Sequence, residues 1–183
     1  MRIISGLHKG RTLKVPSSKF TRPTTDRVRE TLFNILNNII DFDGIEVLDI
    51  YAGSGSLGLE TLSRGASKVD FVEKNFPVYK ILSENISHVK VEEQCYIYKM
   101  EAITLSRLSN HKQYHLILAD PPFFKDDIHD VVRNLIANSF LYDEGMIIVE
   151  RSIQTKEKDV EQFGTEPFKR IGDTLLYKFE KAS

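Results

Sequence analysis

The stretch that decides the fold is residues 47–58, which read Val47-Leu48-Asp49-Ile50-Tyr51-Ala52-Gly53-Ser54-Gly55-Ser56-Leu57-Gly58. It begins as an apolar run, as a buried strand does, and ends as the first turn of a helix. The loop between them is rich in glycine, which adopts positive φ and lets a ligand approach the backbone closely. The last glycine, Gly58, lets the helix pack tightly on the strand. Because free N–H groups at a helix N-terminus favour an anionic group, the stretch predicts a ligand-binding unit.

A carboxylate follows this loop at a spacing that indicates the kind of ligand. Glu73 lies twenty residues beyond Gly53 and closes the apolar run of residues 69–72. An acidic residue at that distance accepts hydrogen bonds from both hydroxyls of a ribose. We therefore expect the chain to bind a cofactor that contains a nucleoside.

Two features weigh against a nicotinamide dinucleotide, which the glycine pattern alone leaves open. Asp49 lies at the end of the strand, four residues before Gly53, where a carboxylate would repel a pyrophosphate. The same carboxylate suits the amino group and the sulfonium of S-adenosylmethionine. The second feature is the segment 120–123, which belongs to no dehydrogenase fingerprint.

This second segment, Asp120-Pro121-Pro122-Phe123, follows the apolar run of residues 116–119. Its two prolines fix φ and remove two N–H donors, so the corner is rigid and rich in acceptors. The Asp120 carboxylate and the Pro121 carbonyl suit an exocyclic amine, and the aromatic ring suits the base that carries it. Holding such an amine in line with a methyl sulfonium favours attack through positioning and electrostatics. The alternative is a rigid loop that only closes a strand.

Apolar runs and helical stretches alternate over most of the chain. We expect strands at 45–51, 68–73, 95–99, 114–119 and 145–150, and helices at 56–64, 75–87, 101–109 and 127–138. This alternation predicts a doubly wound α/β sheet. Residues 163–171 and 174–180 flank Gly172-Asp173, which predicts a hairpin and an antiparallel last strand. Ligands bind such sheets beyond the carboxyl ends of the strands, where Asp49, Glu73 and Asp120 all fall.

The first 40 residues follow a different pattern. Residues 2–5 and 12–15 predict two short strands of a β-arm, and residues 16–23 a loop. Apolar residues at helical spacing then predict an amphipathic helix, capped by Thr24 or Thr25, that runs to about residue 40. We therefore divide the chain into an arm with its loop, 1–23, and a main domain, 24–183.

The charge is concentrated at one end of the chain. The net charge is −1, but residues 1–30 hold eight Lys and Arg against two acidic residues, a net of +6. A basic segment on an acidic body is a site for a polyanion such as nucleic acid. A solvated face is the alternative.

The bulk composition excludes several classes of protein. A chain of 183 residues suits one domain. No apolar run approaches the roughly 20 residues of a membrane span, and the first residues are too short and polar for a signal peptide. The single Cys95 forms no internal disulfide and is expected to be buried, so we expect a cytoplasmic protein. The five histidines are scattered, which predicts no metal site, and His129 is expected on a helix surface.

Together these motifs carry a family resemblance. The chain resembles the S-adenosylmethionine-dependent amino-methyltransferases and, more narrowly, the RsmD-type 16S ribosomal RNA guanine-N2 methyltransferases. The resemblance spans nearly the whole chain, and the matching stretches comprise residues 2–6, 9–11, 22–33, 49–66, 71–74, 120–123 and 172–174. The block 22–33 discriminates most, since generic methyltransferases lack it.

The resemblance implies a Rossmann-like class I methyltransferase fold and a role for individual residues. It assigns the cofactor to Asp49, Tyr51, Ala52, Gly53, Ser54, Gly55, Glu73, Lys74, Glu101 and Ala102. It assigns the guanine amine to Asp120, Pro121, Pro122 and Phe123, and the RNA to Lys9, Arg11, Arg22, Thr24, Asp26 and Arg27. The chain departs from the family at Glu101, where Asp or Asn is usual, and at Phe123, where many relatives have Tyr. For Tyr51, packing beside the loop is the simpler role.

The expected activity is methyl transfer from S-adenosylmethionine to N2 of a guanine in 16S ribosomal RNA. We expect a monomer that works on a small-subunit particle without a metal ion. An adenine-N6 DNA methyltransferase or a glutamine-side-chain methyltransferase is an alternative, because Asp/Asn-Pro-Pro-aromatic corners serve those amines too. A non-catalytic RNA-binding or ribosome-assembly protein that retains the cofactor fold is a third possibility.

Overall fold

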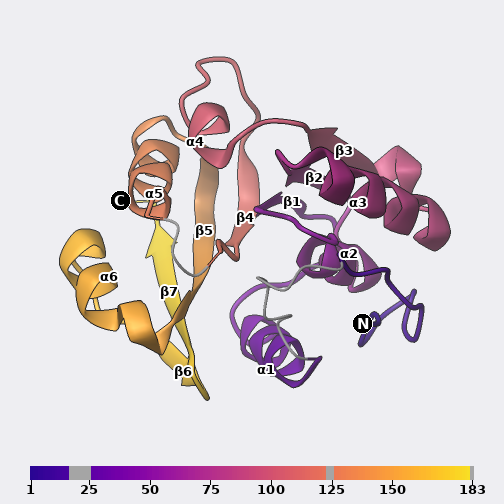
Figure 1. The fold of residues 1–183 in the computed structure, drawn as a ribbon, viewed down its shortest axis with the longest axis horizontal. Helices are drawn as coiled ribbons and strands as arrows, with labels where there is room; N and C mark the ends of the chain where they lie inside the picture. The colour runs from indigo at the N-terminus through magenta and orange to yellow at the C-terminus, as the bar shows by residue number, and fades with distance from the viewer. Residues whose placement is uncertain (17–25, 123–125, 182–183) are drawn as a thin grey trace.

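A computed structural model describes residues 1–16, 26–122 and 126–181 of the chain. Within these ranges seven strands form one sheet in the order β3-β2-β1-β4-β5-β7-β6 (Figure 1). The strands are β1 (Glu46–Ile50), β2 (Lys68–Val72), β3 (Cys95–Tyr98), β4 (Tyr114–Ala119), β5 (Leu141–Ser152), β6 (Lys169–Ile171) and β7 (Thr174–Glu180). The first five pair in parallel, and β7 pairs antiparallel with both β5 and β6, so the expected doubly wound sheet with an antiparallel end is confirmed.

Helices cover both faces of this sheet (Figure 1). They are α1 (Asp26–Leu36), α2 (Ser56–Ser63), α3 (Phe76–Val89), α4 (Ala102–Leu105), α5 (Ile128–Ala137) and α6 (Lys156–Phe163), with short 3-10 helices at Glu92–Gln94 and Ile153–Thr155. The apolar residues of α1, α2 and α3 pack in one cluster and those of α4, α5 and α6 in another. In the described part of the chain no helix is long and apolar enough to cross a membrane.

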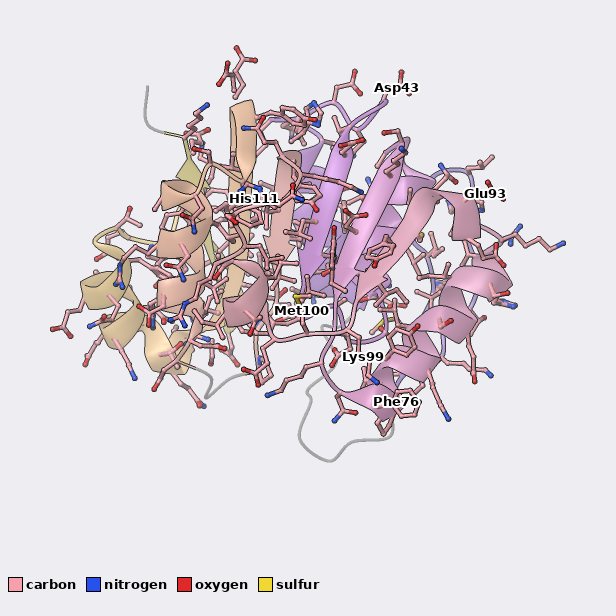
Figure 2. All side chains as sticks on the ribbon, turned by 90° about the horizontal axis from the view of Figure 1, so that it is seen from above. Asp43, Phe76, Glu93, Lys99, Met100 and His111 are labelled. Carbon is pink, nitrogen blue, oxygen red and sulfur yellow. The ribbon has the colours of Figure 1, made fainter. Side chains whose placement is uncertain are left out.

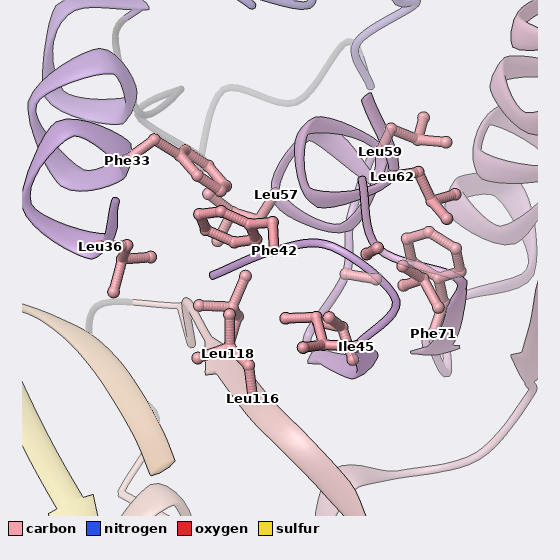
Figure 3. Packing of buried hydrophobic residues seen from close by; sticks show 14 of the residues in the cluster. Phe33, Leu36, Phe42, Ile45, Leu57, Leu59, Leu62, Phe71, Leu116 and Leu118 are labelled. Carbon is pink, nitrogen blue, oxygen red and sulfur yellow. The ribbon is translucent and has the colours of Figure 1, made fainter. Parts of the chain in front are cut away.

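The core explains why the central strands read as continuous apolar runs. On β4, Leu116 and Leu118 face the cluster under α1 and α2, while Ile117 faces the cluster under α5. Figure 3 shows the first cluster, where Phe33 of α1 packs on Phe42 near Leu57 of α2. A strand that is covered on both faces needs apolar side chains at every position.

The register of β1 brings the functional motifs to one edge of the sheet. Ile50 pairs with Val72 of β2 on one side and with Ala119 of β4 on the other. The residues that follow these three strands therefore leave the sheet side by side at its carboxyl edge. The chain order also reverses between β1 and β4, and ligands of such sheets bind at this switch point. Figure 2 shows the two edges, with Asp43 and Glu93 at the amino edge and Phe76 and Lys99 at the carboxyl edge.

The N-terminal arm closes on itself through backbone hydrogen bonds, from the Ile3 N–H to the Arg11 carbonyl, at 3.0 Å, and from the Leu13 N–H to the Met1 carbonyl, at 2.9 Å. The two strands expected at 2–5 and 12–15 are reduced to a single bridge between Arg2 and Thr12. The buried carboxylate of Glu60 in α2 accepts the N–H groups of Ile4, at 2.7 Å, and Ser5, at 3.1 Å. These bonds take the N–H groups of residues 4 and 5 away from the arm, so the β-arm is present but the strands do not extend over the full 2–5 and 12–15 that were expected. The domain boundary predicted after residue 23, and the caps at Thr24 and Thr25, lie outside the described residues.

Several element boundaries also differ from the expectation. The first helix ends at Leu36 instead of about residue 40, and α4 stops at Leu105 instead of residue 109. The strand expected from residue 163 is only the three residues of β6, and α6 before it was not expected at all. Lys156–Phe163 carries mostly charged side chains, so no apolar periodicity marks this helix in the sequence.

Candidate functional site

The glycine loop between β1 and α2 has the backbone that its sequence predicts. Gly53 and Gly55 have φ of 56° and 78°, the left-handed region that favours glycine. Among the described residues, a Cβ on Gly53 would meet only the Tyr51 carbonyl, at 3.8 Å, so this part of the structure leaves the loop open on the side where a ligand would approach. Ala52 and Ser54 are buried in the same loop.

Gly58 has a packing role. A Cβ at this position would lie 2.4 Å from Cε1 of Phe71 and 2.8 Å from Cγ1 of Val69. Both of these side chains belong to β2, so Gly58 allows the first turn of α2 to lie close on the neighbouring strand. The expectation that the third glycine serves tight packing is confirmed, with β2 as the surface that it packs against.

Asp49 is buried under the loop and anchors the start of α2. Its side chain is 1% exposed, and Oδ2 accepts the N–H of Gly58 at 2.9 Å. Burial raises the pKa of this carboxyl well above its usual range; the Gly58 N–H lowers the pKa, and the carboxylates of Asp120 and Glu73 raise it. The three carboxylates thus act on one another electrostatically, and a cationic ligand among them would relieve their repulsion.

Glu73 braces the loop from the end of β2. Its Oε2 accepts the N–H of Gly53 at 3.1 Å, and its Oε1 accepts the N–H of Asn75 at 2.7 Å. A carboxylate offers about four acceptor positions, so these two bonds leave capacity for hydroxyl donors. Glu73 can therefore hold the loop and a ribose together.

Lys74 and Glu101 form an ion pair beside Glu73. Lys74 Nζ lies 3.0 Å from Oε1 of Glu101, and about half of each side chain is exposed. Glu101 precedes the first turn of α4, in which Ala102 is buried. The structure therefore brings Lys74, from the end of β2, close to Glu101 and Ala102, which follow β3. All three residues are expected near the cofactor.

The Asp-Pro-Pro corner leaves β4 next to the glycine loop. Asp120 follows Ala119, the partner of Ile50, and is partly exposed; Pro121 is buried and Pro122 is exposed. Phe123 lies outside the described residues. The acceptor groups of the corner and the open side of the loop therefore share the carboxyl edge of two adjacent strands.

Tyr51 reaches from the glycine loop to the segment that follows this corner. Its hydroxyl donates to Oδ1 of Asp127, just before α5, at 2.9 Å. Burial raises the pKa of the hydroxyl, and the Asp127 carboxylate raises it further. Tyr51 also has φ of 61°, a left-handed backbone that costs energy for a residue other than glycine. Its side chain bridges two segments of the site.

The described residues among those expected to contact RNA differ in their exposure and in their partners. Lys9 and Arg27 are exposed, whereas Arg11 donates to the carbonyls of His88, at 3.1 Å, and Val89, at 2.8 Å, at the end of α3. Asp26 binds the guanidinium of Arg29 at 3.0 Å. Arg22 and Thr24 lie outside the described residues.

Sequence reasoning missed two buried ionic groups. Arg29 is fully buried in α1 and donates to the Arg2 carbonyl, and burial lowers its pKa. The signal was present, because Arg29 lies on the apolar face with Leu32, Phe33 and Leu36.

His129 belongs to the second of these groups, and its expected place on a helix surface is wrong. It is buried, with Nε2 2.8 Å from Oδ1 of Asp159, and Nε of Arg151 donates to the other carboxylate oxygen at 2.9 Å. This partner lies thirty residues away, beyond the reach of local patterns. Cys95 is partly buried, and burial raises the pKa of its thiol to about 12. Among the described residues no three His, Cys, Asp or Glu side chains are grouped as metal ligands.

A mostly parallel sheet with a ligand loop after its central strand is the arrangement of the Rossmann-like class I methyltransferases, and solved structures agree. The chain superimposes on yhhF from Escherichia coli with a TM-score of 0.80 and 31% identity, covering 100% of this chain and 99% of that one. HI0767 from Haemophilus influenzae gives a TM-score of 0.72 and 29% identity, with 98% of both chains covered. The fold is therefore that of a class I methyltransferase.

The family is equally clear. The chain belongs to the family described as Conserved hypothetical protein 95, whose match spans residues 1–180. Ribosomal RNA small subunit methyltransferase D of Escherichia coli is 37% identical over 154 residues, covering 84% of this chain and 76% of the relative. The protein of the same name from Haemophilus influenzae is 40% identical over 152 residues, covering 82% and 78%. These matches confirm the RsmD-type resemblance.

Proposed function

We propose that this protein transfers a methyl group from S-adenosylmethionine to the exocyclic N2 of a guanine in 16S ribosomal RNA. The observation that carries the proposal is the pairing of Ile50 with Ala119. Because adjacent strands lie about 4.8 Å apart, the open glycine loop and the Asp120 corner start as neighbours. A methyl donor and an accepting amine need such closeness. The relatives named ribosomal RNA small subunit methyltransferase D favour this RNA as the substrate.

The residues around the loop fit S-adenosylmethionine. Asp49 is a buried carboxylate that, among the described residues, accepts one N–H and forms no ion pair. A cationic amino acid moiety would compensate its charge, and Glu73 retains acceptors for ribose hydroxyls. Gly53 leaves the backbone accessible, and Lys74 with Glu101 would border the adenine. When bound, S-adenosylmethionine supplies a methyl group made electrophilic by its sulfonium.

The chain's own contribution is to hold and orient the amine. The Asp120 carboxylate accepts one N2 hydrogen and the Pro121 carbonyl accepts the other, which fixes the nitrogen toward the glycine loop. Pro122 keeps the corner rigid, and Phe123 stacks on the guanine. The nitrogen lone pair is delocalised into the base, so positioning and electrostatics supply most of the rate. We infer that a monomer does this in the cytoplasm on a small-subunit particle, without a metal ion.

The decisive experiment compares Asp120→Ala and Asp120→Asn with the parent protein on small-subunit particles from cells that lack this protein. Asp120→Ala is expected to keep the parent melting temperature and cofactor affinity, while the single-turnover rate falls by about 10²-fold or more. Asp120→Asn keeps one acceptor oxygen and is expected to retain more activity. Asp130→Ala is the matched control, because Asp130 is an exposed carboxylate that pairs only with Arg133 among the described residues.

Mass mapping of the modified nucleotides identifies the base. N2-methylguanine in 16S ribosomal RNA supports the proposal, and methylation of adenine N6 or of a protein glutamine overturns its substrate. Particle binding without release of S-adenosylhomocysteine would identify a non-catalytic protein. An Asp120→Ala variant that turns over like the parent removes the amine-holding role.

A further inference from the structure

An exposed aromatic ring lies between two lysines at the carboxyl edge of the sheet. Phe76 is the first residue of α3 and is 48% exposed. The Lys80 ammonium lies 4.7 Å from the centre of its ring, and the Lys99 ammonium lies 4.2 Å from it. Lys80 comes from the next turn of α3 and Lys99 follows β3, so two separate elements supply the cations.

A second ring extends this surface. Tyr79 lies 6.2 Å from Phe76, centre to centre, with the ring planes inclined by only 14°. Lys74, which pairs with Glu101, lies two residues before Phe76. Phe76, Tyr79, Lys80 and Lys99 together are called the Phe76 surface below.

The core of the protein does not explain this arrangement. Phe76 belongs to neither hydrophobic cluster, and the helix start is already capped by Asn75, whose side chain accepts the N–H of Val78. A phenyl ring that is half exposed to water gains little from folding. Each cation–π contact at an exposed site contributes only about 0.5–1 kcal/mol. The surface is therefore suited to a ligand that uses both an aromatic ring and positive charge.

Single-stranded RNA has this chemistry. Its bases stack on aromatic rings and its phosphates pair with lysines, without dependence on one particular base. Lysine side chains are flexible, so an incoming base can take the place of one ammonium on the Phe76 ring while that ammonium moves to a phosphate. The adenine of the cofactor is a poorer match, because it is neutral and carries no phosphate for two ammonium groups to pair with.

The position of the surface also fits a strand of RNA that enters the proposed site. Phe76 and Lys99 lie at the carboxyl edge in Figure 2, the edge from which Asp120 leaves β4. In the sheet order, β3 and β4 are separated by β2 and β1, which makes three strand spacings, or about 14 Å. A few nucleotides span that distance.

We propose that the Phe76 surface is a stacking platform for an unpaired base of the RNA, a few nucleotides from the methylated one. This inference rests on the proposed function and adds a second contact region to the RNA. Phe76 holds the base, Tyr79 supports the ring from the side, and Lys80 and Lys99 hold the flanking phosphates.

The test compares variants of the whole protein for binding to protein-free 16S ribosomal RNA over a series of KCl concentrations. Phe76→Ala removes the ring and Phe76→Tyr keeps it. Lys80→Gln combined with Lys99→Gln removes the charge. Tyr96→Ala is the matched aromatic control, because Tyr96 is 57% exposed on β3 and packs on Tyr98, with no cation over its ring among the described residues. Lys68→Gln is the charge control, since Lys68 is exposed at the amino end of β2.

Phe76→Ala is expected to weaken RNA binding by roughly 5- to 150-fold, the range for loss of one stacked base. Phe76→Tyr and both controls are expected to bind like the parent. The double lysine variant is expected to flatten the slope of log affinity against log salt by about 1.4. Cofactor affinity, measured by calorimetry, is expected to stay unchanged in all variants.

Two results overturn the proposal. If Phe76→Ala binds RNA like the parent while the parent methylates ribosomal RNA, the Phe76 surface is not a platform. If Phe76→Ala loses affinity for S-adenosylmethionine instead, the ring belongs to the cofactor site. A parent protein that methylates no ribosomal RNA refutes the proposed function itself, which the same assay reveals separately. The double lysine variant keeps the test valid if loss of the ring disturbs α3.

Discussion

The Tyr51 hydroxyl donates a hydrogen bond of 2.9 Å to the Asp127 carboxylate, which links the glycine loop to the segment after the Asp-Pro-Pro corner. Tyr51 is the residue that follows β1, and Asp127 comes seven residues after Asp120. The bond therefore joins the two parts of the proposed site, the one for the methyl donor and the one for the amine. Because the pKa of the hydroxyl is raised, Tyr51 stays a donor throughout the neutral range.

Removing this bond is expected to slow methyl transfer more than it weakens cofactor binding. Tyr51→Phe deletes only the hydroxyl and leaves the Asp127 carboxylate without that donor. This loss is expected to lower the free energy of unfolding by about 1.5–3 kcal/mol. Asp127→Asn keeps an acceptor oxygen and is expected to be milder than Asp127→Ala. A double-mutant cycle on single-turnover rates measures the coupling, which we expect to exceed about 0.5 kcal/mol. Strictly additive effects would show that the two residues act separately.

The substitutions Gly53→Ala in the loop and Gly58→Ala in α2 are expected to have different effects. Gly58→Ala forces a methyl group against Phe71 and Val69, so the unfolding free energy should fall by about 1–3 kcal/mol. Gly53→Ala has space for its methyl group, and its φ of 56° lowers the unfolding free energy by only about 1–2 kcal/mol. The added methyl group nevertheless fills the open side of the loop. Its cofactor affinity should therefore drop.

Gly10→Ala is the matched control for both glycine variants. It carries a φ of 85°, no described residue comes within 4 Å of the added methyl group, and it belongs to the N-terminal arm. Urea unfolding and calorimetry with S-adenosylmethionine separate the two effects. Equal loss of cofactor affinity in Gly53→Ala and Gly10→Ala would contradict this division of roles.

The buried carboxyl of Asp49 is expected to make stability depend on pH. In the unfolded chain an aspartate loses its proton near pH 3.9, whereas the folded protein retains it up to the raised pKa of Asp49. Above about pH 4 the folded state binds more protons, so this contribution to stability declines as pH rises through the folded pKa. Asp49→Asn has no carboxyl group to ionise, so its free energy of unfolding should rise relative to that of the parent as pH increases from about 4 through the folded pKa.

The same variant should bind S-adenosylmethionine more weakly, because the negative charge is gone while the acceptor for Gly58 remains. Urea titrations at several pH values measure the first effect and calorimetry the second. Parallel stability profiles for the parent and Asp49→Asn would show that Asp49 ionises as easily as it does in the unfolded chain.

The basic arm is expected to divide into a structural and an RNA-binding part. Arg11 binds two carbonyls at the end of α3, so Arg11→Gln should lower the unfolding free energy by roughly 1–2 kcal/mol. Lys9 is exposed, so Lys9→Gln should leave the melting temperature unchanged and flatten the salt dependence of RNA affinity by about 0.7. An unchanged salt slope for Lys9→Gln would mean that this lysine is only solvated.

The sequence predicts the centre of the fold better than its periphery. The runs that became β1, β2 and β4 are apolar because helices cover both faces, and this burial is visible in the residues themselves. The positions of the acidic residues at the ends of these strands are predicted from the same apolar runs. By contrast, α6 is held by the buried Asp159, whose partners His129 and Arg151 come from α5 and β5. Such a helix depends on distant contacts, and no local pattern reports them.

The site shows the same division. The positive φ of Gly53 agrees with what the glycine pattern predicts. The hydrogen bond from its N–H to Glu73 was not predicted, because the spacing indicates only a ribose contact for that carboxylate. The hydrogen bond from Tyr51 to Asp127 joins residues 76 positions apart, and the bonds from Arg11 to the end of α3 join residues at least 77 positions apart. Their geometry depends on how the helices pack, so a spacing rule within one motif cannot reveal it.

The attachment of the N-terminal arm has a consequence for the order of folding. The arm is synthesised before its partners, because Glu60 and Ser63, and then Asn85, follow it by 55 to 71 residues. The N–H groups of Ile4, Ser5, His8 and Lys14 therefore have no native partner until α2 and α3 exist, and docking of the arm belongs to a late stage of folding. Until then the buried Arg29 lacks the Arg2 carbonyl that it binds in the native protein. Slow closure of the arm would be the step at which a nascent chain becomes resistant to proteolysis.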